Sequence, residues 1–180
     1  SPSGPGKFAK TVFVTGANGF VGSHLVRRLV ADGHRVRALI RPSADRSRIA
    51  DSPIEWVKGD LDDRDALRSG CDGAHWIIHV AGRIKAPNEA AYRHANCTGT
   101  INLLDAAQAA SPQLERLVYV SSQAAGGPSH PGRPRTEDDP PEPVTPYGKS
   151  KLAGEREVIV RADRLPVVAI RPPAVYGPGD

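Results

Sequence analysis

The stretch TGANGFVG, residues 15–22, decides how this sequence folds. It follows TVFVT (11–15), a β-branched run typical of a buried strand. It leads into 20–33, where apolar residues recur at helical spacing as far as a terminal glycine. The sequence therefore predicts a strand, a tight glycine-rich turn and a helix that follow one another directly.

The glycines of this turn recur at every third position, and each has a separate role. Gly16 permits the tight turn, Gly19 lets the backbone approach a pyrophosphate, and Gly22 lets the helix pack closely on the strand. The free N–H groups and positive dipole end of the helix favour a phosphate. The spacing is GxxGxxG, a relative of the GxGxxG fingerprint, and a glycine-rich turn without function is the alternative. Strand before and helix after favour dinucleotide binding, through Gly16, Asn18, Gly19, Phe20, Val21 and Gly22.

Strand and helix patterns alternate along the rest of the chain. Strands are expected at 11–15, 35–40, 54–58, 75–80, 116–122 and 167–171, and helices at 20–33, 62–69, 89–110 and 146–163. This alternation predicts an α/β fold, a doubly wound parallel sheet in three layers with helices covering both faces. The nearly continuous apolar run at 75–80 is typical of a central strand.

Two segments depart from this alternation. Residues 123–144 contain so many prolines and glycines that no regular element is expected there. Because this segment leaves the carboxyl end of a strand, we predict a lid or substrate loop. Residues 1–10 are rich in Pro, Gly and Ser and are expected to be a mobile segment ahead of one domain, 11–180.

Composition argues against several classes of protein. Hydrophobic residues make up 39% of the 180 residues and charged residues 24%, as in a soluble globular domain, and no membrane span is expected. The net charge of +4 comes from 24 basic and 20 acidic residues that are interspersed, so no nucleic-acid partner is expected. Cys71 and Cys97 match no metal spacing, no metal site is expected, and both are predicted to be buried thiols in the cytoplasm.

The end of the second strand indicates which dinucleotide would bind. An acidic residue there would bond to an unmodified ribose and repel a 2′-phosphate, but Leu39, Ile40 and Arg41 are not acidic. Arg41 could pair with a phosphate, whereas Arg46 and Arg48 fit a solvated loop equally well. NADP is therefore favoured, with NAD as the alternative.

Small and acidic residues end the next two strands. Asp60 in KGDLDD could accept a hydrogen bond from the adenine amino group, with Leu61 packed on the ring. Capping of the following helix is the competing explanation for Asp60, although Asp62 could cap it equally well. The fourth strand ends in residues small enough for a cofactor to pass, namely Val80, Ala81 and Gly82.

A tyrosine and a lysine four residues apart suggest proton transfer. Tyr147 and Lys151, in TPYGKSK, share one face of the predicted helix, where an ammonium favours the ionised form of a phenol. A solvated helix face with this spacing by chance is the alternative. VSS, however, ends the fifth strand at the same edge of the sheet. Ser122 could donate to a substrate oxygen there, whereas Ser121 is expected to satisfy backbone groups.

Taken together, these motifs resemble the extended short-chain dehydrogenase/reductase family, of the NAD-dependent epimerase/dehydratase type. TGANGFVG, VAG, NCTGT, VSS, YGKSK and RPPAVYGPGD occur in that family's order from residue 11 onward. The resemblance implies a Rossmann domain in which hydride passes between a nicotinamide and a carbon that bears oxygen. It implies that Ser122 positions the substrate oxygen, that Tyr147 is the acid/base, and that Lys151 tunes it and holds the nicotinamide ribose. It also implies a structural or proton-relay role for Asn96 and a nicotinamide lining of Pro172 and Val175.

The resemblance leaves the substrate open among a sugar nucleotide, a ketone and a sterol-like molecule. The 25 residues from Ser122 to Tyr147 are similar to the spacing in the family's sugar-nucleotide epimerases, whereas RVRALIR resembles its NADP-dependent ketone reductases. Family members continue past YGPG into a small substrate domain, which is expected to be absent here, and their long helices pair in homodimers. A non-catalytic dinucleotide-binding sensor or scaffold is the alternative function, which the Ser-Tyr-Lys set argues against.

Overall fold

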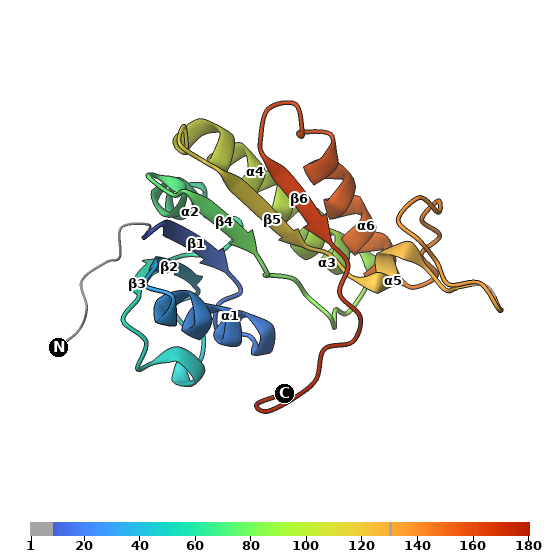
Figure 1. Cartoon of the computed structure of the whole chain (residues 1–180), viewed down its shortest axis with the longest axis horizontal. Helices are drawn as coiled ribbons and strands as arrows, with labels where there is room; N and C mark the ends of the chain where they lie inside the picture. Colours follow the sequence, from blue (N-terminus) through green and yellow to red (C-terminus); the bar gives the residue numbers. More distant parts are fainter. Residues whose placement is uncertain (1–8, 130) are drawn as a thin grey trace.

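The computed structural model describes residues 9–129 and 131–180. A parallel sheet of six strands in the order β3-β2-β1-β4-β5-β6 forms its centre, with helices packed on the sheet (Figure 1). The predicted α/β class and doubly wound parallel sheet are confirmed. Residues 1–8 of the expected mobile segment lie outside the described residues. Lys10, close to its end, is anchored, since its ammonium pairs with Glu115 at 2.5 Å.

All six expected strands are present. They are β1 (Thr11–Thr15), β2 (Arg35–Ile40), β3 (Glu55–Lys58), β4 (Trp76–His79), β5 (Arg116–Val120) and β6 (Val167–Ile170). The helical elements are α1 (Phe20–Ala31), η1 (Ser47–Ile49), α2 (Arg64–Cys71), α3 (Glu89–Arg93), η2 (His94–Thr98), α4 (Gly99–Ala110), α5 (Gln123–Gly126) and α6 (Pro146–Ile159). Strand β4 lies between β1 and β5, which confirms that the run at 75–80 is central.

The strand order creates a switch point between β1 and β4. From β1 the chain adds β2 and β3 on one side, and it then crosses back to add β4, β5 and β6 on the other. Because all strands are parallel, the turns that follow β1 and β4 leave the same edge in opposite directions. Open α/β sheets bind ligands in the crevice that results.

The two faces of the sheet are covered to different extents. Helices α2, α4 and α6 cover one face, over a core that includes Phe13, Leu117 and Tyr119. On the other face, α1 and η1 cover a smaller core. Val168 and Ile170 of β6 point to this second face and are 39% and 45% exposed. Full coverage of both faces, as predicted, is therefore wrong at β6, because no described helix packs there.

Two other expectations about regular structure need correction. The helical stretch 89–110 is interrupted, since η2 is a π-helical segment between α3 and α4. Such segments often occur at functional sites. The segment 123–144 begins with the short helix α5, because Ser122 caps the N–H of Ala124 at 3.1 Å. Gly126 is the last residue of this one-turn helix, and the other glycines and the prolines of the segment follow it.

The cysteines are buried free thiols, as expected. Burial raises the pKa of Cys71 to about 12, so its reactive thiolate form is disfavoured. None of the helices in the described ranges combines the length and apolar character needed to cross a bilayer.

Candidate functional site

Gly16 and Gly22 bring the turn after β1 into close contact with its neighbours. Gly16 has a φ of +72°, and a Cβ there would lie 2.6 Å from the backbone nitrogen of Ala81, just after β4. A Cβ on Gly22 would overlap the carbonyl oxygen of Gly16 and lie 2.8 Å from its carbonyl carbon. The tight turn and the close helix packing thus both require glycine.

Gly19 leaves the outer side of the turn open. It is the N-cap of α1 with an ordinary φ of −72°, and a Cβ there would approach only the carbonyl oxygen of Gly16, at 3.3 Å. Among the described residues no side chain caps α1, so the N–H groups of Phe20, Val21 and Gly22 have no side-chain acceptor there. An exposed cradle that a Cβ would fill, at an uncapped helix N-terminus, fits the phosphates of a dinucleotide. Asn18 flanks it and donates to the carbonyl of Asp45 at 3.0 Å.

The arginines after β2 differ in their surroundings. Arg46 lies over the ring of Trp56, 5.0 Å from its centroid, and Arg48 donates to the carbonyl of Gly179. Both therefore have structural contacts, which favours the non-functional reading of these two residues. Arg41 lies exposed at the end of β2, and no hydrogen bond or ion pair within the described residues engages its guanidinium.

The cap of the helix after β3 is a different acidic residue from those expected. Asp63 is the N-cap of α2, since its carboxylate accepts from the N–H of Ala66 at 2.9 Å. Capping by Asp60 or by Asp62 is therefore wrong, because the helix begins later than predicted. Asp60 accepts from the N–H groups of the two residues that follow Leu61 and is exposed at the sheet edge. Leu61 is half-buried against the core, beside Gly99.

A buried hydrogen-bond chain joins the ends of β1 and β4 to η2. Thr100 Oγ1 donates to the carbonyl of Asn96 at 2.9 Å, so it accepts from Nε2 of His79 at 3.0 Å. Nδ1 of His79 then accepts from the hydroxyl of Thr15 at 2.6 Å, whose oxygen accepts from the N–H of Ala81 at 3.3 Å. Burial and the nearby lysine charge lower the pKa of His79 to about 3, which keeps it neutral.

Asn96 fixes the backbone of the loop after β4. Its Oδ1 accepts from the N–H of Arg83 at 2.7 Å, and its Nδ2 donates to the Arg83 carbonyl and to Ser150 Oγ. Ser150 in turn donates to the carbonyl of Tyr147 at 2.7 Å. The amide of Asn96 therefore positions two segments. One is the loop that contains Gly82, the last residue of VAG, and the other is the first turn of α6.

Lys151 is buried beneath the same loop. It is 3% exposed, and its Nζ lies 4.4 Å from the ring centroid of Tyr119 in β5. A Cβ on Gly82 would lie 3.4 Å from this Nζ. Burial lowers the pKa of Lys151 to about 8, while the charge of Glu155 opposes the shift. A desolvated ammonium at the carboxyl edge of the strands is suited to stabilise a neighbouring anion.

Tyr147 lies in the first turn of α6, four residues before Lys151 and on the same face. Thr145 caps this helix by accepting from the N–H of Gly148 at 2.9 Å, and Pro146 occupies the first helical position. The half-buried Tyr147 ring packs edge-to-face against Tyr92, with centroids 6.3 Å apart.

The two serines after β5 have separate partners. Ser122 Oγ accepts from a backbone N–H at the start of α5, which leaves its own O–H proton to donate to another acceptor. Ser121 donates to the buried carboxylate of Glu155 at 2.6 Å. The expectation that Ser121 satisfies backbone groups is wrong, because α6 presents a carboxylate at this point.

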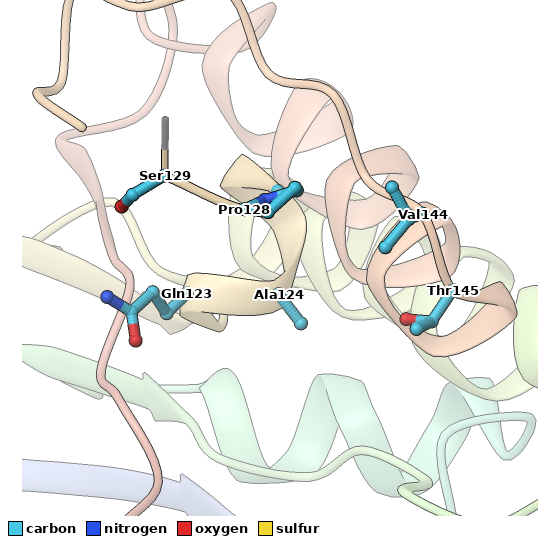
Figure 2. Close-up of a pocket in the computed structure, with 7 residues that line it drawn as sticks. Gln123, Ala124, Pro128, Ser129, Val144 and Thr145 are labelled. Atoms are coloured by element: carbon cyan, nitrogen blue, oxygen red, sulfur yellow. The ribbon is translucent and has the colours of Figure 1, made fainter. Parts of the chain in front are cut away.

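A pocket of about 370 Å³ opens beside α5, the helix that begins at the residue after Ser122 (Figure 2). It lies between α5 and the segment before α6, and the described residues of its lining, which include Ala124, Val144 and Thr145, carry no charged side chain. Pro172 lies beside it, since its carbonyl accepts from the N–H of Gln123 at 2.9 Å. The segment that follows carries Val175, which is 49% exposed.

Several residues of this site were not predicted from the sequence. They are Thr15, His79, Thr100, Ser150, Glu155 and Arg171. Glu155 follows Lys151 by four residues, so its place on the same helix face could have been found from spacing. The others are recognised only through contacts between distant segments.

Comparison with known proteins gives a consistent match. The model of the NAD dependent epimerase/dehydratase family matches residues 12–180. Ceramide reductase of Caulobacter vibrioides is 40% identical over 169 residues, which are 94% of this chain and 47% of the relative. Sterol demethylase protein B of Methylococcus capsulatus is 35% identical over 175 residues, which are 94% of this chain and 53% of the relative.

A solved structure is also similar. That of UDP-glucuronic acid 4-epimerase from Bacillus cereus, in complex with NAD, has a TM-score of 0.82 and 27% identity. The similarity covers 94% of this chain and 58% of that one. The chain spans about half the length of the curated relatives it matches.

Proposed function

The chain belongs to the NAD dependent epimerase/dehydratase family, and we propose that it is the cofactor-binding and proton-transfer part of an oxidoreductase that reduces a ketone. One observation carries this proposal. The buried Lys151 lies at the carboxyl edge of the sheet, one helical turn after Tyr147 and beside the loop that follows β4. A buried ammonium one helical turn away stabilises the phenolate that forms when a tyrosine gives its proton to a substrate.

The proposed roles follow from these contacts. The dinucleotide, when bound, supplies the hydride that reaches the carbonyl carbon. Ser122 donates its free O–H proton to the carbonyl oxygen and orients it, and Tyr147 transfers its phenolic proton to that oxygen. Lys151 stabilises the phenolate that remains and holds the nicotinamide ribose. Asn96 keeps the loop and the first turn of α6 in register through its amide bonds.

The proposed dinucleotide site lies across the switch point of the sheet. Its phosphates would rest on Gly19 and the N-terminus of α1, flanked by Asn18, with Gly16 and Gly22 shaping the turn. The adenine would lie near Asp60 and Leu61, and the nicotinamide would lie among Val80, Ala81, Gly82, Pro172 and Val175.

We propose a preference for NADP. Arg41 is exposed at the end of β2, where an acid would otherwise bond to the ribose hydroxyls, and its charge suits a 2′-phosphate. A preference for NADP fits net reduction. An epimerase, in contrast, returns the hydride to its substrate and has no net demand for a reduced cofactor.

The substrate that we propose is a ketone on a largely apolar molecule. The described residues that line the pocket beside α5 carry no charge, and one of them, Val144, is 71% exposed, which suits an apolar ligand. Two of the relatives are named for a ceramide and for a sterol, and both are lipids. A sugar nucleotide is the second candidate, favoured by the likeness to UDP-glucuronic acid 4-epimerase.

Two other features stay predictions. Pairing of two copies through α4 and α6 would cover Ile159 and Val160, which are 56% and 68% exposed. A cytoplasmic location would suit the free thiols of Cys71 and Cys97.

The test is NADPH-dependent turnover by the longest form of the protein that can be produced. A panel would contain a ceramide-like ketone, a sterol ketone and UDP-sugars, with product stereochemistry and NADPH consumption both measured. Tyr147→Phe should keep cofactor affinity and lose about a hundredfold or more in rate. Tyr92→Phe is the matched control, since its hydroxyl bonds to the carbonyl of Ile84 and is not expected to transfer protons.

The outcomes separate the alternatives. Consumption of NADPH with a ketone supports the proposal, whereas inversion of a UDP-sugar without net consumption supports the epimerase. If wild type and Tyr147→Phe bind NADPH equally well and neither acts on any member of the panel, a sensor or scaffold module is favoured.

A further inference from the structure

A buried carboxylate behind the proposed site joins three elements. Glu155 of α6 is 3% exposed. It accepts from Ser121, at the end of β5, at 2.6 Å. It also accepts from Nε of Arg171, after β6, at 3.0 and 3.2 Å, and the second guanidinium contact is 2.5 Å. The sequence patterns alone indicate no role for Glu155 or Arg171.

Each partner of this carboxylate adjoins a residue of the proposed site. Ser122 follows Ser121, and its hydroxyl is assigned to the substrate oxygen. Pro172 follows Arg171 and is assigned to the nicotinamide lining. Lys151 precedes Glu155 by one turn of α6, on the same face. A shift at this carboxylate would therefore move all three site residues relative to one another.

We propose that Glu155 is the positioning residue of this site: its carboxylate fixes the ends of β5 and β6 against α6, and thereby aligns Ser122 and Lys151 for proton transfer. The inference rests on the proposed function for the chemistry that it serves. Glu155 itself is not expected to touch cofactor or substrate, since its oxygens are occupied by Ser121 and Arg171.

The chemistry of the cluster supports positioning over simple stabilisation. A buried ion pair adds little net stability, because desolvation of both charges offsets their attraction. What the bonds do provide is direction, since a guanidinium and a hydroxyl meet the two oxygens in fixed geometry. Three elements are thus held by directional bonds where apolar packing alone would allow them to slide.

The same carboxylate also bears on the charge of Lys151. The groups near this ammonium are Glu155 from α6, Tyr119 from β5 and His79 from β4, and Tyr147 lies one turn earlier on the same face of α6. His79 stays neutral, and Glu155 raises the pKa of Lys151 against the effect of burial. Without the Glu155 charge, Lys151 would lose its proton at lower pH. NADPH affinity that depends on the ammonium is lost as the pH rises, and without Glu155 this loss would begin at a lower pH.

The experiment compares Glu155→Gln with Glu157→Gln. Both substitutions remove a carboxylate of α6 that pairs with an arginine, but Glu157 bonds to Arg161, in the turn just after α6 and away from the site. The readouts are the pH dependence of NADPH affinity and, with an active substrate, the rate of hydride transfer. We expect Glu155→Gln to move the alkaline loss of affinity to lower pH and to slow transfer about tenfold or more. The control should change neither.

A second variant covers failure of Glu155→Gln to fold, which the loss of the ion pair between the buried Glu155 and the half-buried Arg171 could cause. Ser121→Ala removes only the bond to β5 and leaves the Glu155–Arg171 pair intact. It should slow transfer, with cofactor affinity close to that of wild type. Unchanged transfer in Ser121→Ala, or a folded Glu155→Gln with the pH profile and rate of wild type, overturns the inference.

Failure of the proposed function looks different. Wild type would then show no turnover with any carbonyl compound, whereas the pH profile of NADPH affinity would still report on Glu155. A shifted profile in Glu155→Gln supports its influence on Lys151 even in that case, and an unshifted profile overturns it.

Discussion

Gly22→Ala should lower the stability of the fold, whereas Gly19→Ala should lower its affinity for NADPH, although the two glycines belong to one turn. At Gly22 a Cβ would overlap the carbonyl oxygen of Gly16, which is backbone and cannot rotate away. Such overpacking costs about 1–3 kcal/mol, and the helix propensity of alanine returns about 1 kcal/mol at most. We therefore expect Gly22→Ala to lower the free energy of unfolding by about 1–2 kcal/mol, and the melting temperature by about 2–4 °C for each kcal/mol.

Gly19→Ala should leave stability nearly unchanged. Its φ of −72° suits any residue, and the closest atom to a Cβ is the Gly16 oxygen at 3.3 Å. Alanine is a poorer N-cap than glycine but loses less entropy on folding, so the net change should stay within about 0.5 kcal/mol. The methyl group would, however, occupy the cradle assigned to the pyrophosphate. We expect NADPH affinity to fall about tenfold or more, which is about 1.4 kcal/mol.

Urea unfolding without cofactor and fluorescence titration with NADPH measure the two effects separately. Each variant is the control for the other, because both add one methyl group to the same turn. Gly19→Ala with the cofactor affinity of wild type would mean that the phosphates do not rest on this turn. Gly22→Ala with the stability of wild type would refute the argument from close packing.

Three other changes test the site and its support. His79 has a pKa of about 3 in the fold and about 6.5 when unfolded, so its contribution to stability is complete above pH 6.5 and is lost as the pH falls. Between pH 6.5 and 5 the free energy of unfolding should fall by about 2 kcal/mol, at about 1.4 kcal/mol per pH unit, and His79→Gln should lack this slope in urea titrations. Asp63→Ala should cost about 1 kcal/mol in thermal unfolding through loss of the α2 cap, whereas Asp62→Ala should cost less than about 0.5 kcal/mol; equal costs would contradict the assignment of the cap. Arg41→Ala should reduce the preference for NADP over NAD about tenfold, measured as a ratio of dissociation constants, and an unchanged ratio would show that Arg41 does not bind the 2′-phosphate.

Patterns that are local in the sequence predicted the strands and the glycine turn correctly. The strands and the glycine turn depend on runs of a few residues, and each run carries its own period or turn chemistry. Helix boundaries were less certain, as with α2, because three aspartates in KGDLDD can each cap a helix. In the structure Asp60 accepts from the N–H groups of Asp62 and Asp63 instead, and α2 begins after Asp63.

Contacts between distant segments could not be predicted from such patterns. In the sequence, nothing distinguishes His79 from the other residues of an apolar strand. In the structure it bonds to Thr15 and Thr100 and stays neutral. Ser121 and Ser122 look equivalent in VSS. They differ because successive residues of an extended chain point to opposite faces, and the carboxylate of Glu155 lies on the face to which Ser121 points.

The sequence by itself determined the order of elements, the glycine turn and the spacing of Tyr147 and Lys151, because backbone sterics and helix periodicity act over a few residues. Only the tertiary structure decided how deeply Lys151 is buried, which acid caps α2 and which carboxylate ties the ends of β5 and β6 to α6. The burial of Lys151 and the bonds of Glu155 depend on solvent exclusion and on atoms that lie more than thirty positions away along the chain, as in the Ser121–Glu155 bond, whereas the cap depends on the residue at which α2 begins.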